Sequence, residues 1–429
     1  MARQIRSIQD VVEGQLCTGC GACAAVEANR FEMRDTLDFC RRPFVKEEAV
    51  AENGQGLQSC PGYALAHDKD LADADIQSDL TAGWGPVLDV WEGYATDPDV
   101  RFKGSSGGAA TALSVFAIEK GGLSGVLHTK ANDEIAYLNE TTISLTKEQL
   151  IAASGSRYSP SSPCEGLADL KSLPGPAAFV GKPCDVAALS KARKLDAEID
   201  KKIGISIGFF CAGTPSTNGT LKLLQKSGIS DPKNLQSLRF RGNGWPGLWT
   251  ADYTDQEGLS NTVQMTYAES WGFLQKYRQW RCYICPDHTA EFADISVGDP
   301  WYRAVEPGEA GKSLIVARTK AGRDFILKAA AEGYITLETN EAALLPASQP
   351  NLLKTRGSLW ARLIVLRILG AASPEYSGFK MVRYWWHDLS LRNKMQSFFE
   401  TGKRVFRKNL HKRVKIAAWS PDERPQNDD

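Results

Sequence analysis

Cysteines are the residues of this chain whose spacing most directly suggests chemistry. Cys17, Cys20 and Cys23 stand at C-x2-C-x2-C in "CTGCGACAAV", and Cys60 follows in "SCPG", directly before a proline. A triplet at this spacing with a remote Cys-Pro is typical of bacterial ferredoxins. The glycines between the cysteines let the backbone wrap one face of a cubane and point N–H groups at its sulfurs. The four cysteines therefore predict a 4Fe-4S cluster.

The first group has an alternative metal, zinc, and an alternative fourth ligand, Cys40. Zinc usually takes two pairs of ligands rather than a triplet with one distant partner. In bacterial ferredoxins a fourth cysteine follows the triplet after three intervening residues, and no cysteine stands there in "CAAVEANR". The fourth ligand must therefore return through a loop. Cys40 competes for this place, and the proline after Cys60 favours Cys60.

Four further cysteines are scattered through the chain. Cys184 follows "VGKP", Cys211 ends the apolar run "IGFFC", and Cys282 and Cys285 lie in "RCYICPDH". No spacing rule joins them, but Cys184 and Cys211 stand where an α/β core gathers its functional loops. They could converge on a second cluster, or Cys184 and Cys211 could be ordinary buried cysteines. The residue pattern leaves both readings open.

A glycine-rich stretch precedes an expected helix in "RFKGSSGGAATAL". Such a loop allows close backbone approach, and the helix N-terminus favours phosphate. A tight strand–helix turn is the alternative. A second loop, "SGSRYSPSSP", carries Arg157 and Tyr158, and "RFRGNGWPG" adds Arg239 and Arg241. Together these stretches predict a phosphorylated aromatic cofactor, and a flavin nucleotide fits, with arginines on its pyrophosphate.

Six motifs occur in an order that resembles the coenzyme F420 hydrogenase/dehydrogenase beta-subunit family, to which 7-hydroxymethyl chlorophyll a reductase is related. They are "KGSSGGAATAL", "SGSRYSPS", "VGKPCDVAALSK", "FFCAGTPS", "RFRGNGWPG" and "CYICPDHTAEFADISVGDPW". The resemblance covers about residues 10–310 and implies an iron–sulfur flavoprotein with FAD and two 4Fe-4S clusters.

The resemblance also implies roles for individual residues. The second cluster would be bound by Cys184, Cys211, Cys282 and Cys285. The residues expected to line the FAD are Gly104, Ser105, Ser106, Gly107, Gly108, Thr111, Ser156, Arg157, Tyr158 and Lys182. Asp294 and Asp299 are interpreted as turn and cap residues, and no catalytic acid, base or nucleophile is identified. Cys40 and Cys164 have no assigned role.

The function implied is an oxidoreductase that passes electrons from a one-electron donor, such as a ferredoxin, through the clusters to FAD. The two-electron acceptor would be a deazaflavin such as F420, as a candidate substrate, or another reducible small molecule. The alternative is a non-catalytic electron-relay subunit of a larger redox complex.

The elements that must position these residues alternate between strand and helix. Strands are expected at 87–96, 123–130, 177–182 and 202–210, and helices at 109–122 and 183–195. The fold class expected is mixed α/β. A ferredoxin-like 4Fe-4S domain would occupy residues 1–80, an FAD- and cluster-binding core 84–353, and a basic, aromatic helical extension 354–429.

Composition and charge bear on the partners and the location of the protein. The 429 residues carry no net charge, so no overall field favours nucleic acid. The N-terminus lacks the continuous apolar run of a secretory signal, and the run at 359–372 is too short to span a bilayer. The chain is predicted to be cytoplasmic and to form a homo-oligomer, with its cysteines reduced.

The last part of the chain is strongly basic. Residues 354–415 contain 15 Lys and Arg against 3 Asp and Glu, interleaved with aromatic residues. Such a segment suits an anionic membrane surface or an acidic protein such as a ferredoxin. Alternatively its aromatic side chains pack on the protein's own core or on a second subunit and its charges remain solvated.

Overall fold

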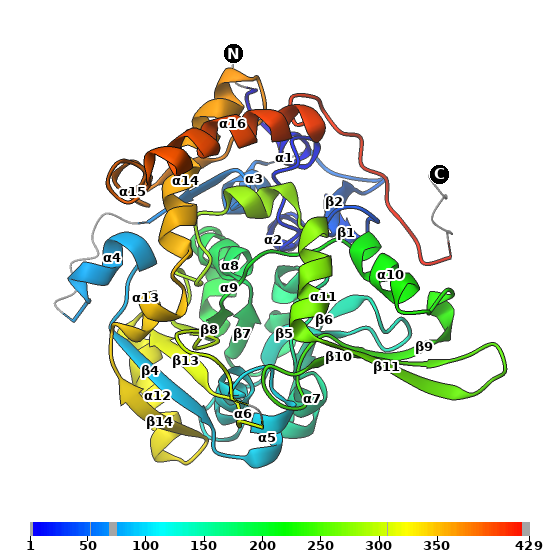
Figure 1. The fold of residues 1–429 in the computed structure, drawn as a ribbon, viewed down its shortest axis with the longest axis vertical. Helices are drawn as coiled ribbons and strands as arrows, with labels where there is room; N and C mark the ends of the chain where they lie inside the picture. The colour runs from blue at the N-terminus through cyan, green and yellow to red at the C-terminus, as the bar shows by residue number, and fades with distance from the viewer. Residues whose placement is uncertain (1–2, 52, 68–74, 307, 423–429) are drawn as a thin grey trace.

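A central mixed sheet of eight strands organises the computed structural model, which describes residues 3–51, 53–67, 75–306 and 308–422 (Figure 1). The strand order is β14-β4-β13-β12-β8-β7-β5-β6. The strands are β4 (Asp89–Ala95), β5 (Val126–Ala131), β6 (Asn139–Ser144), β7 (Ala177–Gly181), β8 (Ile203–Phe209), β12 (Ile295–Gly298), β13 (Ser313–Ala317) and β14 (Ile335–Asn340). All four strands predicted from the sequence are confirmed.

The middle of the sheet is parallel and its margins are antiparallel. Strands β5, β7, β8 and β12 run parallel to their neighbours in this group, whereas β6, β13, β4 and β14 pair antiparallel. The apolar runs of β7 and β8 suit strands covered on both faces. Cys184 and Cys211 follow the carboxyl ends of β7 and β8, so they reach the same edge of the sheet.

Helices cover both faces of this sheet. Helices α6 (Ala109–Glu119) and α12 (Lys320–Ala331) share one hydrophobic core with one face, to which α7 (Lys147–Ala152) adds Leu150. Helices α8 (Pro183–Leu195) and α9 (Ala197–Lys201) cover the other face beside β7 and β8. The predicted helices at 109–122 and 183–195 are therefore confirmed, the second with its bounds unchanged.

A second layer of structure extends from one side of the sheet (Figure 1). It contains a three-stranded antiparallel sheet with the order β11-β10-β9. Its elements are α10 (Thr217–Lys226), β9 (Leu235–Arg239), β10 (Leu248–Thr254), β11 (Ser260–Thr266) and α11 (Tyr267–Leu274). This layer has its own core, which includes Phe240, Trp249 and Leu274.

The N-terminal and C-terminal segments lie together at one end of the molecule (Figure 1). The N-terminal elements are α1 (Ile8–Glu13), α2 (Ala22–Val26), β1 (Phe31–Arg34), β2 (Arg42–Val45), α3 (Gln55–Ser59) and β3 (Ala64–Ala66). The C-terminal ones are α13 (Leu344–Ser348), α14 (Leu352–Ile368), β15 (Glu375–Ser377), α15 (Met381–His387) and α16 (Leu391–Arg407). Strand β15 pairs with β3, and Val11, Leu363 and Val405 share one core.

The acidic sequence "DKDLADADIQSD" at 68–79 predicts a linker or a solvated helix, but this stretch lies largely outside the described residues. Its last residues lead into α4 (Ser78–Trp84). Nowhere in the described segments does a helix combine the length and the apolar character needed to cross a bilayer.

Candidate functional site

The first group of cysteines surrounds one small cavity. Cys17, Cys20, Cys23 and Cys60 all line it, together with apolar side chains of α1 and β2. Cys40 is buried but is not among the lining residues. The structure thus brings Cys60 rather than Cys40 to the triplet.

The loop that carries the triplet depends on two glycines. Gly19 and Gly21 have φ angles of 77° and 90°, a region that side-chain-bearing residues rarely adopt. A Cβ at Gly21 would lie 2.7 Å from the backbone N of Glu165. The loop is held from outside as well, because the Ser162 hydroxyl donates to the Gly19 carbonyl (2.6 Å).

The second group comes together from three separate segments. Cys184 lies in the first turn of α8, Cys211 follows β8, and Cys282 and Cys285 lie in or directly after the short helical turn Trp280–Ile284. Cys211 interacts electrostatically with both Cys282 and Cys285. Backbone N–H groups point at two sulfurs, because Gly213 donates to Cys211 Sγ (3.3 Å) and Thr214 to Cys282 Sγ (3.4 Å).

Two buried residues lie between the two cysteine groups. The Cys40 thiol interacts with both Cys282 and Cys17. The Arg281 guanidinium donates to the carbonyl of Pro61, next to Cys60 (3.0 Å), and to that of Ile284, next to Cys285 (3.3 Å). Arg281 is 3% exposed. The two groups are therefore neighbours, with a buried positive charge between them.

All ten cysteines lie in the described segments, and none of them is paired in a disulfide. Burial, followed by repulsion from a neighbouring thiolate, raises the pKa of Cys20 to about 12 and that of Cys60 to about 11. The same causes raise the pKa of Cys211 to about 12. A metal that binds these sulfurs must displace their protons, so loading would release protons. No three His, Cys, Asp or Glu side chains in the described ranges are spaced to hold one metal ion.

A cavity of about 330 Å³ adjoins the second cysteine group. Its wall includes Cys211 itself, and it extends from the carboxyl ends of β7 and β8 to the N-terminus of α6. Of the residues predicted to bind a cofactor, the wall contains Gly104, Ser105, Ser106, Gly108, Thr111, Ser156, Arg157, Tyr158 and Lys182. Gly107 is the exception. Its N–H donates to the Ser313 hydroxyl (2.9 Å), and a Cβ there would meet the backbone of β13 at 2.7 Å.

One end of the cavity is suited to an anion. Helix α6 begins at Gly108 without a side chain that caps its N-terminus, and Ala109, Ala110 and Thr111 line the wall. The first N–H groups of a helix have no partners within the helix and carry partial positive charge. Ser105 and Ser106 belong to the same wall, where the Ser105 hydroxyl accepts from Ser156 N (2.6 Å) and the Ser106 hydroxyl pairs with that of Ser313 (2.9 Å).

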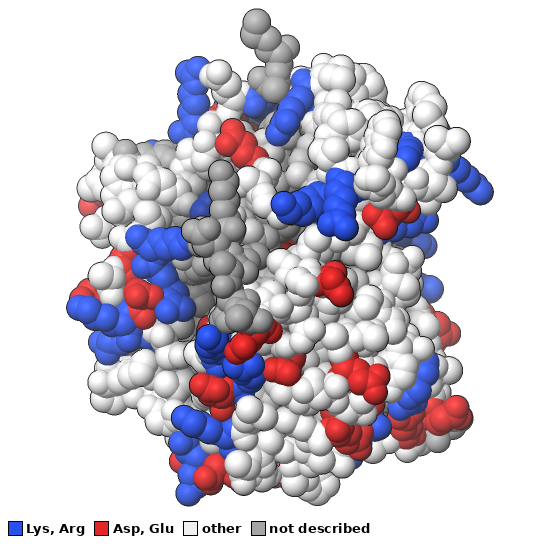
Figure 2. All heavy atoms as spheres, turned by 90° about the vertical axis from the view of Figure 1, so that its left-hand side faces the viewer, with Lys and Arg blue, Asp and Glu red and all other residues white. Residues whose placement is uncertain are grey.

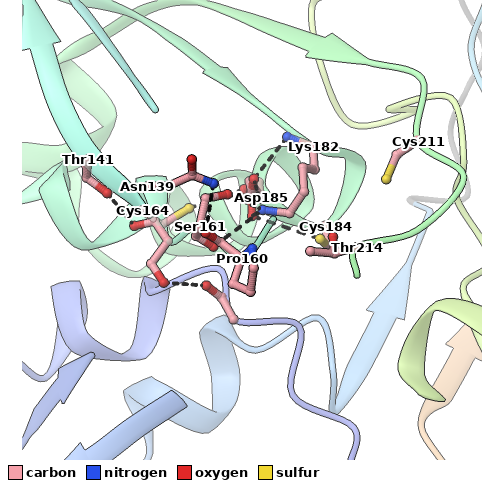
Figure 3. Close-up of polar contacts among 12 residues, drawn as sticks. Asn139, Thr141, Pro160, Ser161, Cys164, Lys182, Cys184, Asp185, Cys211 and Thr214 are labelled. Carbon is pink, nitrogen blue, oxygen red and sulfur yellow. Dashed lines mark hydrogen bonds and ion pairs between the residues drawn. The ribbon is translucent and has the colours of Figure 1, made fainter. Parts of the chain in front are cut away.

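The cations of the wall already have protein partners. The Arg157 side chain donates to Asn139 Oδ1 (2.7 Å) and to three backbone carbonyls, so it fixes the loop rather than facing an anion. The Lys182 ammonium contacts the Asp185 carboxylate (2.7 Å) and the Ser161 hydroxyl (3.0 Å), beside Cys184 and Cys211 (Figure 3). Burial opposes this charge, but Asp185 outweighs it and raises the pKa of Lys182.

Arg241 forms a bidentate ion pair with Asp299 (2.9 and 2.8 Å). Asp299 also accepts from the Trp245 indole N–H (3.0 Å). The interpretation of Asp299 as only a turn or cap residue was therefore wrong, because its carboxylate holds a buried cation in the cavity wall. Asp294 is structural as predicted, since it accepts from Ser206 N (2.9 Å) and Oγ (2.7 Å).

Aromatic side chains form another part of the cavity wall, close to the serines, since Arg241 donates to the Ser105 carbonyl (2.5 Å) and lies 4.5 Å from the centroid of the Tyr267 ring. Tyr267 and Trp301 stack with an interplanar angle of 2°, and Tyr158 contacts Trp271 at a centroid distance of 5.1 Å. The sequence predicted a binding role for Tyr158 but not for Tyr267, Trp271 or Trp301. They are up to 143 residues from Tyr158 along the chain, and no local pattern links them.

His288 is a residue of the cavity wall with one ring nitrogen that has no hydrogen-bond partner. Its Nδ1 donates to the Cys211 carbonyl (2.9 Å), and its Nε2 has no hydrogen-bond partner. Burial lowers the pKa of His288 to about 4, so the imidazole is neutral near pH 7. Nε2 then carries a lone pair that a ligand N–H could satisfy.

Comparison with known proteins gives this arrangement a family, the beta subunits of coenzyme F420 hydrogenase/dehydrogenase. The N-terminal part of that family matches residues 90–168, and its C-terminal part matches residues 176–343. The chain belongs to this family. The two matches contain β4 (except Asp89) through β14 and all four cysteines of the second group, together with every residue of the cavity wall except Gln349 and Leu352.

Individual relatives agree with this assignment. The beta subunit of coenzyme F420 hydrogenase from Methanosarcina barkeri is 28% identical over 56% of this chain and 77% of its own length. A subunit of the F(420)H(2) dehydrogenase from Methanosarcina mazei is 23% identical over 80% of this chain and 88% of its own. The beta subunit of F420-dependent formate dehydrogenase 1 from Methanococcus maripaludis is 26% identical over 56% and 59%.

A solved structure shares the fold. A chain of the F420-reducing [NiFe] hydrogenase complex from Methanosarcina barkeri superposes with a TM-score of 0.50 and 21% identity. The superposition covers 65% of this chain and 93% of the other. The mixed α/β class is thereby confirmed, whereas the ferredoxin-like and flavin-binding assignments remain predictions.

Proposed function

We propose that this chain is an iron–sulfur flavoprotein oxidoreductase that exchanges electrons between a one-electron protein donor and a two-electron small-molecule acceptor. Cys17, Cys20, Cys23 and Cys60 would hold one 4Fe-4S cluster and the second cysteine group another. FAD would occupy the cavity, and a deazaflavin such as F420 is the acceptor that the named relatives suggest.

The observation that carries this proposal is the order of the three sites. The first cysteine group neighbours the second through Arg281 and Cys40, and Cys211 of the second group forms part of the cavity wall. Short steps between carriers are what single-electron transfer through a protein requires. Bound clusters supply one-electron transfer, and a bound flavin supplies the conversion to two-electron chemistry.

The donor atoms fit these groups. A four-iron cluster is larger than one ion, so its ligands stand further apart than a single-ion geometry allows, and N–H groups already point at Cys211 and Cys282. The cavity lies within the size range of small-molecule sites. Its open helix N-terminus suits a pyrophosphate, and the aromatic side chains of its wall suit a flat ring.

The chain's own residues would orient the ligand and exclude water. Asp299 holds Arg241 under the ring of Tyr267, with the guanidinium 4.5 Å from the ring centroid. Asp185 fixes Lys182 as a cation beside the second cysteine group.

A second candidate function is an electron-relay subunit without its own turnover. The names of the relatives favour it, because several are called subunits of hydrogenases or dehydrogenases. The cysteine groups would serve the same purpose, and the acceptor would react on another chain.

Anaerobic purification with iron, sulfide and flavin analysis tests the proposal. A brown protein with broad absorbance at about 400 nm and extractable FAD is expected. A colourless protein with bound zinc would refute it. Re-oxidation of the reduced flavin by added F420 distinguishes the two candidates, because a relay subunit alone would leave the flavin reduced.

A further inference from the structure

Helix α16 packs its less apolar side against the protein. The side chains it buries are Ser397, Thr401 and Val405. Four larger apolar side chains face solvent instead, with exposed fractions between 55% and 80%: Leu391, Met395, Phe399 and Phe406. At about 100° per residue these four positions fall within one stripe of the helix. An amphipathic helix that packed only on its own core would turn this stripe inward.

The exposed apolar surface continues onto the preceding helix. Trp386 and Val382 of α15 are 64% and 55% exposed. Lys394 connects the two helices, since its ammonium lies 5.4 Å from the centroid of the Trp386 ring and donates to the Trp386 carbonyl (2.7 Å). Helices α15 and α16 lie at the outer edge of the molecule, away from the central sheet (Figure 1). These exposed apolar side chains of α15 and α16 are called the apolar ridge below.

Cations border this ridge. Residues 391–415 contain nine Lys and Arg and one acidic residue, Glu400. Arg392, Lys403 and Arg407 are exposed and follow the apolar stripe around the helix. Lys and Arg side chains also gather at the upper end of the face in Figure 2, the end to which α14 and α16 belong. A second copy docked on the same face would place these cations against one another, whereas an anionic surface would attract them.

We propose that α15 and α16 bind the surface of a bilayer that contains anionic phospholipid. Leu391, Met395, Phe399 and Phe406 would enter the boundary between headgroups and acyl chains. The bordering cations would contact lipid phosphates. Apolar aromatic and aliphatic side chains beside a basic face characterise helices that lie in a membrane interface. Lipid acyl chains adapt to exposed apolar side chains of any arrangement, whereas an acidic protein would need a surface of matching shape to cover them.

Co-sedimentation of the full-length holoprotein with vesicles tests this proposal. Equal mixtures of phosphatidylcholine and phosphatidylglycerol are compared with phosphatidylcholine alone. Binding to the anionic vesicles is expected, and it should weaken as salt screens the cations. The double variant Met395→Ser, Phe399→Ser should bind at least about tenfold more weakly, because two exposed apolar side chains are lost.

Leu259→Ser is the matched control. Leu259 is 60% exposed but lies in the loop between β10 and β11, so this variant should bind vesicles like the unmodified protein. The proposal is overturned if the folded protein does not bind anionic vesicles, or if the double variant binds them as strongly as the unmodified protein does. If the unmodified protein is a dimer that does not bind vesicles, and the double variant is a monomer, the ridge is instead an interface with a second copy of the chain. The assay does not measure cofactors, so its outcome is independent of the proposed redox function.

Discussion

All ten cysteines of this protein are buried or half-buried, but they differ in the groups that contact them. Cys164 is fully buried, and its thiol donates to the Asp185 carbonyl (3.4 Å). It lines neither the first cysteine cavity nor the larger one. Cys282, by contrast, accepts from a backbone N–H and neighbours Cys211. Burial does not distinguish the candidate ligands, and Cys164 itself interacts with Cys20 and Cys23.

Cys282→Ser should therefore lose about half of the bound iron, because one of two four-iron clusters loses a ligand. Flavin occupancy should fall with it, since Cys211 of the same group forms part of the cavity wall. Iron and flavin analysis of the purified protein provides the measurement. Cys164→Ser, which keeps a donor to Asp185, should retain both cofactors. Iron content unchanged in Cys282→Ser would remove this residue from the ligand set.

Arg281 should influence the reduction potential of both clusters. A buried cation stabilises the more negative, reduced state, so Arg281→Gln should lower the potentials by on the order of 50 mV. Arg281→Lys, which keeps the charge, should shift them less. Redox titration monitored by electron paramagnetic resonance measures this effect. Equal potentials in the glutamine variant and the unmodified protein would show that Arg281 is only structural.

At the scale of elements, pairing between β5 and β6 contains a pH-sensitive contact. His128 Nδ1 donates to the Thr129 carbonyl (3.2 Å), so its Nε2 accepts from the Ser144 hydroxyl (2.7 Å). Burial lowers the pKa of His128 to about 4 from its usual 6.5. The folded state therefore favours the neutral ring, and its stabilisation is lost as pH falls from 6.5 towards 4.

Acidification from pH 7 to pH 5 should cost about 2 kcal/mol of folding free energy through this residue. His128→Gln removes the titrating group, so the variant should lose correspondingly less stability over the same interval. Urea denaturation at the two pH values measures the difference. The same loss of stability in both proteins would mean that His128 is already solvated in the folded state.

Local sequence pattern predicted the elements well. The apolar runs of β7 and β8 and the helix from Pro183 to Leu195 were all recognisable, because each is set by neighbours in the chain. The aromatic part of the cavity wall could not be recognised from the sequence, since Tyr158, Tyr267 and Trp301 meet only after folding. The ion pair between Arg241 and Asp299 could not be predicted either, because the two residues are 58 positions apart in the chain.

At the scale of the whole molecule, the C-terminal segment is less separate than its composition suggested. Val405 and Leu410 share a hydrophobic core with Cys17, Cys23 and Cys60. The Gln15 side chain also donates to the Lys408 carbonyl (3.3 Å). The segment that carries the exposed ridge therefore also covers the first cysteine group.

Deletion of residues 380–429 should consequently lose the iron of the first group, about half of the total. The reason is that α16 and the residues after it would no longer shield the four thiols from solvent. Iron analysis and the yield of soluble protein measure the result. Met395→Ser with Phe399→Ser is the control, because both side chains face solvent and the iron content should be unaffected. A truncated protein with its full iron content would contradict this prediction.

The meeting of the two chain ends also sets an order for biosynthesis. Cys17 leaves the ribosome almost four hundred residues before Val405 and Leu410, which complete its surroundings. While translation continues, the first cysteine group stays open to the machinery that delivers iron and sulfide, and to oxygen. The enclosure of this group is therefore one of the last events in the making of the protein.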